Sequence, residues 1–164
     1  MDAMLIEMTI KGLMVDPVTN MPIVILKDRG VERVLPIWVG IFEANAIALQ
    51  MENVAAPRPM THDLLRNIIA DLDGRVDRVV VSDLKDNTFF AVIHLTVRGE
   101  RVAIDARPSD AIALALRARA PILVDEHVID TAKTVDFNAD RTDDDRLQKW
   151  LEGLDPADLG KYKM

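Results

Sequence analysis

IDARPSDAIALALRARAPILV, residues 104–124, is the stretch that decides the fold. Its middle is apolar on nearly every side, so we expect a helix that is buried all round. The start of that helix is crowded with polar side chains instead, namely Asp105, Arg107, Ser109 and Asp110. These four residues form either a cap for a buried helix or the polar end of a functional site.

The chain before this stretch changes from strand patterns to helix patterns. Three strand-like runs come first, MLIEMTIKGLMV (4–15), PIVILK (22–27) and VERVLPIWVG (31–40), separated by short turns. Consecutive strands joined by short turns pair antiparallel. Two helix-like runs follow, an Ala-rich one over 41–53 and an amphipathic one over 61–72.

A second group of strands surrounds the central helix. Four strand-like runs occur at 75–85, 88–98, 101–105 and 121–124. The first two are joined by Asp86-Asn87, which predicts a hairpin. We therefore expect an α+β fold in which a mixed, largely antiparallel sheet packs against two or three buried Ala/Leu-rich helices.

Composition limits the classes of function. The chain has 164 residues and no cysteine, which excludes disulfides, thiolate nucleophiles and cysteine-based metal sites. No apolar run is long enough to span a membrane and no signal-peptide pattern starts the chain, so we expect a cytoplasmic protein without a membrane partner. The net charge of −7 argues against a strongly basic nucleic-acid surface.

The charge is uneven and marks a boundary in the chain. Residues 125–164 hold 11 acidic and 6 basic side chains, so most of the acidity lies near the C-terminus. We expect one domain over 1–130 and an acidic C-terminal helix and tail over 131–164. The predicted helix carries an apolar stripe that needs a cover, so a homodimer or a larger homo-oligomer is expected. The stripe consists of Leu147, Trp150, Leu151 and Leu154.

Two helix starts share an unusual pattern. Arg58-Pro59-Met60-Thr61-His62-Asp63 and Arg107-Pro108-Ser109-Asp110 each place Arg-Pro, a hydroxyl and an aspartate at the start of a helix. Proline is tolerated in the first helical turn, and Thr61 and Ser109 are predicted to be structural caps. The Arg, His and Asp side chains are not explained by capping.

These remaining side chains support two interpretations. In the functional one, carboxylates bind Mg²⁺ or Mn²⁺, an arginine holds a phosphate, and a histidine transfers protons. The predicted catalytic residues are His62, Asp63, Asp105 and Asp110, the metal ligands Asp105, Asp110 and Glu43, and the phosphate-binding residues Arg58 and Arg107. In the structural interpretation, Arg-Asp ion pairs only fix the helix starts.

Motifs of several enzyme classes are missing. The chain has no HExxH, no GxSxG and no Walker-type glycine loop. A zinc protease, an α/β-hydrolase and a P-loop NTPase are therefore unsupported.

Four motifs in a fixed order resemble the bifunctional nuclease family. They are LPIWVGIFEANAIAL, RPMTHDLL, NTFFAVI, and IDARPSDAIALALR followed by PILV, and together they cover about residues 5–130. The resemblance implies a compact α+β domain, called here a bifunctional-nuclease-like domain, and cleavage of both RNA and DNA. It also places Glu43 and the residues of both Arg-Pro segments within shared motifs. Phe90 stands where family members often have tyrosine, so a hydroxyl there is not essential.

Two hypotheses follow from the sequence. The first is a nuclease, a phosphodiesterase acting on RNA and DNA and assisted by a divalent metal. The second is a non-catalytic binding or assembly module whose Arg-Asp pairs are structural. The density of ionisable groups at the two helix starts favours the first hypothesis, and the acidic balance favours the second.

Overall fold

One mixed sheet forms the framework of the protein. The computed structural model describes residues 4–30, 33–132 and 135–136. The strands are β1 (Leu5–Val15), β2 (Pro22–Asp28), β3 (Arg33–Trp38), β4 (Gly74–Lys85), β5 (Thr88–Val97), β6 (Glu100–Ala106), β7 (Ile122–Asp125) and β8 (Val135–Asp136). They lie in the order β6-β5-β4-β7-β1-β2-β3-β8, and only β4 and β7 pair parallel among the described strands. The predicted α+β class with a largely antiparallel sheet is confirmed.

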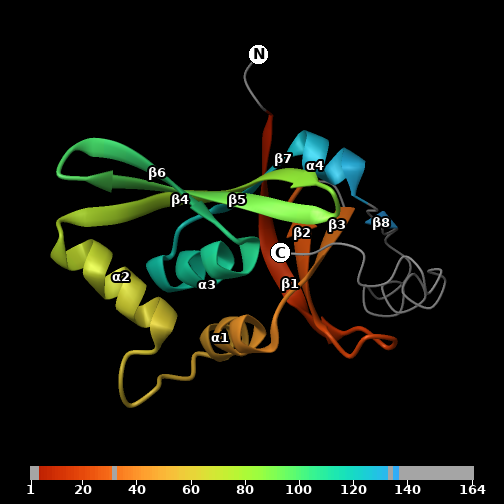
Figure 1. Ribbon diagram of the computed structural model, residues 1–164, viewed down its shortest axis with the longest axis horizontal. Coiled ribbons are helices and arrows are strands. Elements are labelled where there is room, and N and C mark those ends of the chain that lie inside the picture. The colour runs from red at the N-terminus through yellow and green to blue at the C-terminus, as the bar shows by residue number, and fades with distance from the viewer. Residues whose placement is uncertain (1–3, 31–32, 133–134, 137–164) are drawn as a thin grey trace.

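The sheet consists of two three-stranded meanders joined by β7 (Figure 1). The β4-β5-β6 meander turns tightly where the sequence provides residues that tolerate positive φ. Asp86 and Asn87 have φ of 50° and 60°, and Arg98 and Gly99 have φ of 50° and 82°. Two consecutive residues with positive φ match the right-handed twist of the flanking strands. The predicted hairpin at Asp86-Asn87 is therefore confirmed.

Each meander leads into a helix of the same layer. The helices are α1 (Ile41–Met51), α2 (Thr61–Asp71), α3 (Pro108–Ala118) and α4 (Glu126–Thr131). Figure 1 shows α1, α2 and α3 on one face of the sheet and α4 on the other. In α3 the run from Ala111 to Ala115 is fully buried, as its continuous apolar pattern predicts. Small alanines on α1 and α3 allow these two helices to pack against each other.

Helix α2 is oriented differently from what its amphipathic pattern predicts. Four of its large aliphatic side chains are 39–52% exposed. These are Leu64, Leu65, Ile68 and Leu72. The buried residue of α2 is His62, and Ile69 is only partly covered by the core. Polar contacts from the first turn of α2 to α3 set this orientation and leave an apolar stripe uncovered.

The C-terminal part of the chain was predicted as an acidic helix and tail over 131–164. Nearly all of it, including the predicted apolar stripe, lies outside the described residues. None of the helices in the described part is both long and apolar enough to cross a membrane.

Candidate functional site

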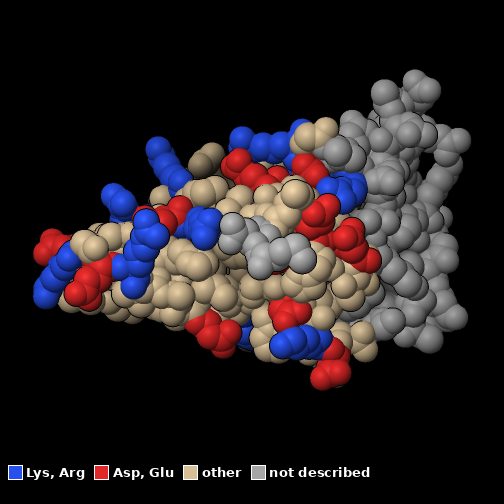
Figure 2. All heavy atoms as spheres, turned by 90° about the horizontal axis from the view of Figure 1, so that it is seen from above, with Lys and Arg blue, Asp and Glu red and all other residues tan. Residues whose placement is uncertain are grey.

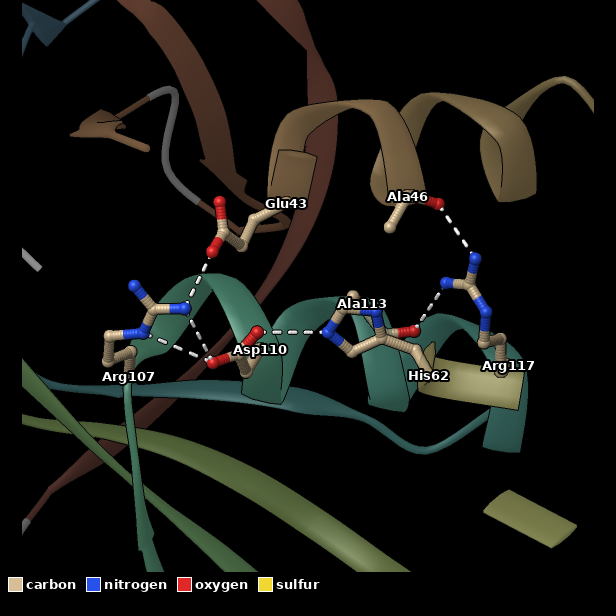
Figure 3. Close-up of polar contacts among 7 residues, drawn as sticks. All are labelled: Glu43, Ala46, His62, Arg107, Asp110, Ala113 and Arg117. Atoms are coloured by element: carbon tan, nitrogen blue, oxygen red, sulfur yellow. Dashed lines mark hydrogen bonds and ion pairs between the residues drawn. The ribbon is translucent and has the colours of Figure 1, made fainter. Parts of the chain in front are cut away.

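The start of α3 holds an arginine between two carboxylates (Figure 3). Arg107 is the N-cap residue of α3, and Pro108 occupies the first helical turn. The Nη2 atom of Arg107 donates to Glu43 Oε1 at 2.6 Å and to Asp110 Oδ2 at 3.0 Å. Its Nε also donates to Asp110 Oδ2, at 3.2 Å. The hydrogen bonds that Arg107 donates first to Glu43 and then to Asp110 raise the pKa of Arg107, so the guanidinium remains charged.

The same aspartate also binds the histidine of α2. Asp110 Oδ1 lies 2.9 Å from His62 Nε2. The His62 side chain is only 8% exposed, whereas that of Asp110 is 34% exposed. Asp110 sits in the first turn of α3, where the free N–H groups and the helix dipole favour a negative charge. The helix start therefore fixes a carboxylate that connects His62 to Arg107.

Glu43 completes the group from the first turn of α1. It follows Gly40, the N-cap residue of that helix. A Cβ atom on Gly40 would overlap the Glu43 carboxylate, so the glycine provides the space that this carboxylate occupies. Four side chains from α1, α2 and the start of α3 thus form a continuous chain of contacts, Glu43–Arg107–Asp110–His62, here called the Arg107 network.

The Arg107 network lines a cavity of about 750 Å³ between the helices and β5–β6. The remaining wall is mainly apolar and includes Leu65 and Ile68 of the exposed stripe of α2. Its aliphatic and aromatic lining residues are Phe42, Met60, Leu65, Ile68, Ile69, Ile93, Leu95, Ile104 and Leu114. Ligand sites commonly combine an apolar hollow with a few convergent polar groups, as this cavity does.

A second ion pair is structural. The Arg117 side chain is 2% exposed and donates to Asp63 Oδ1 at 2.8 Å. Arg117 also donates to the carbonyls of Ala46 and Ala113, both at 2.9 Å. The hydrogen bond from the Met60 N–H lowers the pKa of Asp63 most. The hydrogen bond and the charge of Arg117 lower the pKa further. Asp63 therefore ties α2 to α3 and is not free for the catalytic role predicted for it.

Two other predicted site residues lie away from the Arg107 network. Arg58 is exposed and lines a different cavity of about 280 Å³. Asp105 is an exposed residue of β6, and its carboxylate has no hydrogen-bond or ion-pair partner among the described residues. Asp105 lines the same cavity as the network, but strand alternation pairs it with Val92 rather than with the buried Ile93, and its carboxylate joins none of the network's ion pairs.

The predicted caps are wrong in detail. Met60 and Arg107, not Thr61 and Ser109, are the N-cap residues of α2 and α3. Neither helix has a side-chain N-cap hydrogen bond from its cap residue, and Asp63 instead accepts from the Met60 N–H at 3.0 Å. Ser109 is fully buried, and its hydroxyl has no partner among the described residues.

The predicted metal ligands do not fit a metal ion as they are arranged. Glu43 and Asp110 both lie on the Arg107 guanidinium, which occupies the space between them, and Asp105 lines the same cavity without being grouped with them. Within the described ranges, no three His, Asp or Glu side chains are grouped so that they could hold a metal ion. We therefore derive no step through a metal.

The sequence interpretation missed Arg117 and the cavity wall. Arg117 is a lone charge within the apolar part of α3, seven residues after Asp110, and this spacing places it on the Asp110 side of the helix. That spacing was the signal that could have identified it. The wall was missed because α2 was expected to bury its aliphatic side chains.

Comparison with known proteins decides the family. A family model described as the bifunctional nuclease domain matches residues 24–136. The chain belongs to the bifunctional nuclease domain family. The match covers α1, α2 and α3 and every residue of the Arg107 network.

Relatives differ in how much of their length this bifunctional nuclease domain protein covers. An uncharacterized protein of Mycobacterium tuberculosis, Rv1829, is 36% identical over 96% of this chain and 98% of its own length. Bifunctional nuclease 2 of Arabidopsis thaliana is 29% identical over 65% of this chain and 33% of its own length. The bifunctional nuclease of Oryza minuta is 24% identical over 69% of this chain and 35% of its own length. The plant proteins are therefore much longer than the region they share with this chain.

Proposed function

We propose that the protein is a nuclease that hydrolyses phosphodiester bonds in RNA and DNA at the Arg107 network. Its family supports this class of reaction. The observation that carries the proposal is the contact of Asp110 with both His62 and Arg107 at the wall of the large cavity. A proton-transfer group and a cation thus lie on either side of one carboxylate.

Arg107 is the group that would bind the scissile phosphate. Its planar guanidinium presents several N–H donors that match two phosphate oxygens. Its side chain is 52% exposed, so a substrate can reach it. A phosphate would replace Glu43 or Asp110 as the partner of Arg107, and the remaining carboxylate would keep the guanidinium in place.

His62 would act as the general base. DNA has no 2′-hydroxyl, so that group cannot be the nucleophile for both substrates, and water takes this role in the proposal. The water oxygen bonds to phosphorus as the P–O bond to the leaving sugar oxygen breaks, and that oxygen takes a proton from solvent. An ionised Asp110 only accepts hydrogen bonds, which assigns the proton of a neutral His62 to Nε2 and leaves Nδ1 able to take a proton from water. Asp110 also stabilises the imidazolium that this step produces.

The apolar wall would receive bases of an unpaired strand. Phe42, next to Glu43, is 88% exposed and can stack on a base. The face of the sheet opposite α1, α2 and α3 carries Lys and Arg side chains interspersed with Asp and Glu across its described part (Figure 2). Such a mixed surface attracts a duplex backbone weakly, so binding would depend on base contacts in the cavity.

One observation favours the alternative of a non-catalytic binding module. Arg107 is already held by two carboxylates, as in a structural ion pair that fixes a helix start. In that case the cavity would bind its ligand without cleaving it. Direct measurement of cleavage and of binding separates the two functions.

The test is cleavage of a fluorescein-labelled single-stranded RNA and of the DNA of the same sequence. Asp110→Asn and Asp105→Asn form one matched pair, and Arg107→Gln and Arg58→Gln form a second. We expect Asp110→Asn, Arg107→Gln and His62→Asn to slow cleavage by about 10²-fold or more. Asp105→Asn and Arg58→Gln are expected to keep the wild-type rate.

Each reaction is run with Mg²⁺, with Mn²⁺ and with EDTA, after circular dichroism has shown that every variant is folded. A wild-type rate in His62→Asn and Arg107→Gln would overturn the proposed site. Labelled RNA that binds in anisotropy measurements but stays intact in all three conditions would support the binding module instead.

A further inference from the structure

The strand at one end of the sheet has an open backbone edge. β6 pairs with β5 on one side and has no strand on its other side among the described residues. The equivalent strand of the other meander, β3, is covered by β8. Nearly every residue of β6 is exposed. An open edge of this length readily pairs with another chain.

The sequence of β6 is complementary to itself when it runs antiparallel to a second copy. Centred on Ala103, such a pair places Arg101 opposite Asp105 and Val102 opposite Ile104. The Arg101–Asp105 pair and the Val102–Ile104 pair then each occur twice, as a two-fold axis requires. A centre at Ile104 would instead bring Arg101 opposite Arg107, where the charges repel.

The charges of β6 are available for such pairing. Arg101 and Asp105 are both exposed, and neither has a hydrogen-bond or ion-pair partner in the described part of the chain. Both lie on the outer face of the sheet, since their strand partners Thr96 and Val92 alternate with the buried residues of β5. In the paired arrangement each Arg101 meets an Asp105.

The apolar side of β6 also lacks a cover. Val102 and Ile104 are 38% and 44% exposed and lie on the same face as the aliphatic stripe of α2. Exposed aliphatic side chains that adjoin an open strand edge are typical of an interface. A second β6 would extend the sheet over this side and shield the apolar groups.

We propose that the protein forms a two-fold homodimer in which β6 of each copy pairs antiparallel about Ala103. The two sheets join into one, with Arg101–Asp105 pairs on the outer face and Val102–Ile104 pairs on the helix face. The strand from the second copy forms part of the rim of the large cavity, so each site lies beside the interface.

A charge exchange tests this register in the full-length protein. Light scattering after size exclusion is expected to give twice the monomer mass of 18.3 kDa for the wild type. Arg101→Asp and Asp105→Arg each place like charges opposite each other, so each is expected to weaken dimerisation by at least tenfold. The double variant restores opposite charges and is expected to recover the dimer.

A cysteine at the two-fold axis provides an independent measurement. The chain has no native cysteine, and paired antiparallel residues have Cα atoms about 5 Å apart, within the range for a disulfide. Ala103→Cys is expected to yield a covalent dimer on mild oxidation. The matched control Val18→Cys, which is 56% exposed in the turn after β1, is expected to remain monomeric under denaturing conditions.

Three outcomes would overturn the proposal. The first is a monomer at all concentrations, and the second is a dimer that neither single charge reversal weakens. The third is formation of a covalent dimer by Ala103→Cys at a rate no higher than that of Val18→Cys. Thermal melts of all variants show whether each one is folded.

Discussion

His62 Nε2 lies 2.9 Å from Asp110 Oδ1, although 48 residues separate the two side chains in sequence. This contact and the Asp63–Arg117 pair are the polar connections that fix the first turn of α2 against α3. One connection lines the cavity and the other is buried beside it. The predictions below separate the residues that hold the fold from those that form the site.

Replacing Arg117 with methionine is expected to lower the free energy of unfolding by about 3–5 kcal/mol. The change leaves the Asp63 carboxylate without its cation and two backbone carbonyls without a donor. Urea denaturation measures the loss. Arg75→Met is the control, because the Arg75 side chain is 77% exposed and water screens its pair with Asp77, so little loss is expected. Equal losses in the two variants would contradict a structural role for Arg117.

Ser109→Ala is expected to raise the free energy of unfolding by about 1 kcal/mol. The hydroxyl is fully buried without a partner among the described residues, and alanine removes its desolvation cost while favouring the helix. The same denaturation experiment tests this. Ser82→Ala serves as a comparison, since the Ser82 hydroxyl donates to the Phe90 carbonyl at 3.5 Å and its removal is expected to be neutral or slightly destabilising. A clear loss of stability in Ser109→Ala would reveal a hydrogen bond that this interpretation lacks.

Gly40→Ala is expected to disturb the Arg107 network without substituting any of its four residues. The added methyl group takes the space of the Glu43 carboxylate, which must move away from Arg107. We expect cleavage activity to fall to that of Glu43→Gln, and the Arg107 Nε–H signal to shift in NMR spectra. Gly12→Ala is the matched control, because a Cβ there meets no atom within 4 Å. Unchanged NMR signals in Gly40→Ala would show that Glu43 does not depend on this glycine.

His127 is expected to stabilise the fold more at low pH than at high pH. Hydrogen bonds that the protonated ring donates first to Asp125 and then to Asp83 raise the pKa of His127, so the folded protein binds this proton more tightly than the unfolded chain. The contribution is complete below the unfolded pKa of about 6.5 and is lost as the pH rises through the folded pKa. The difference in melting temperature between wild type and His127→Gln should therefore shrink as the pH rises.

His94 provides a control of opposite sign for the same titration. Burial and then the nearby Arg78 lower the pKa of His94, so its protonation opposes folding. Relative to wild type, His94→Gln should gain stability as the pH falls. If His94→Gln and His127→Gln showed the same dependence on pH, a general charge effect would explain both, and the proposed local contacts would not.

Local pattern was enough to predict most of the fold. The continuous apolar run in α3 and the turn at Asp86-Asn87 depend on neighbouring residues, and the structure confirms both. The orientation of α2 could not be predicted in this way. It depends on His62 and Asp63 meeting Asp110 and Arg117 from a distant part of the chain.

The candidate site was predicted only in part for the same reason. Arg107, Asp110, His62 and Glu43 meet as one group, but Asp105 does not join them. Proximity in sequence suggested a shared role, whereas strand alternation pairs Asp105 with Val92, so its carboxylate joins none of the ion pairs although the residue lines the same cavity. The strand period was a better guide to its position than its distance from the helix start.

The placement of β7 determines when the protein can complete its fold during synthesis. β7 lies between β1 and β4, and its register pairs Leu5 with Asp125. Each meander can form from the residues that have already left the ribosome, because its strands are consecutive in the chain. The inner edges of β1 and β4 must wait until β7 emerges, so the first half-sheet stays unsealed from the completion of β3 at Trp38 and the second from the completion of β6 at Ala106.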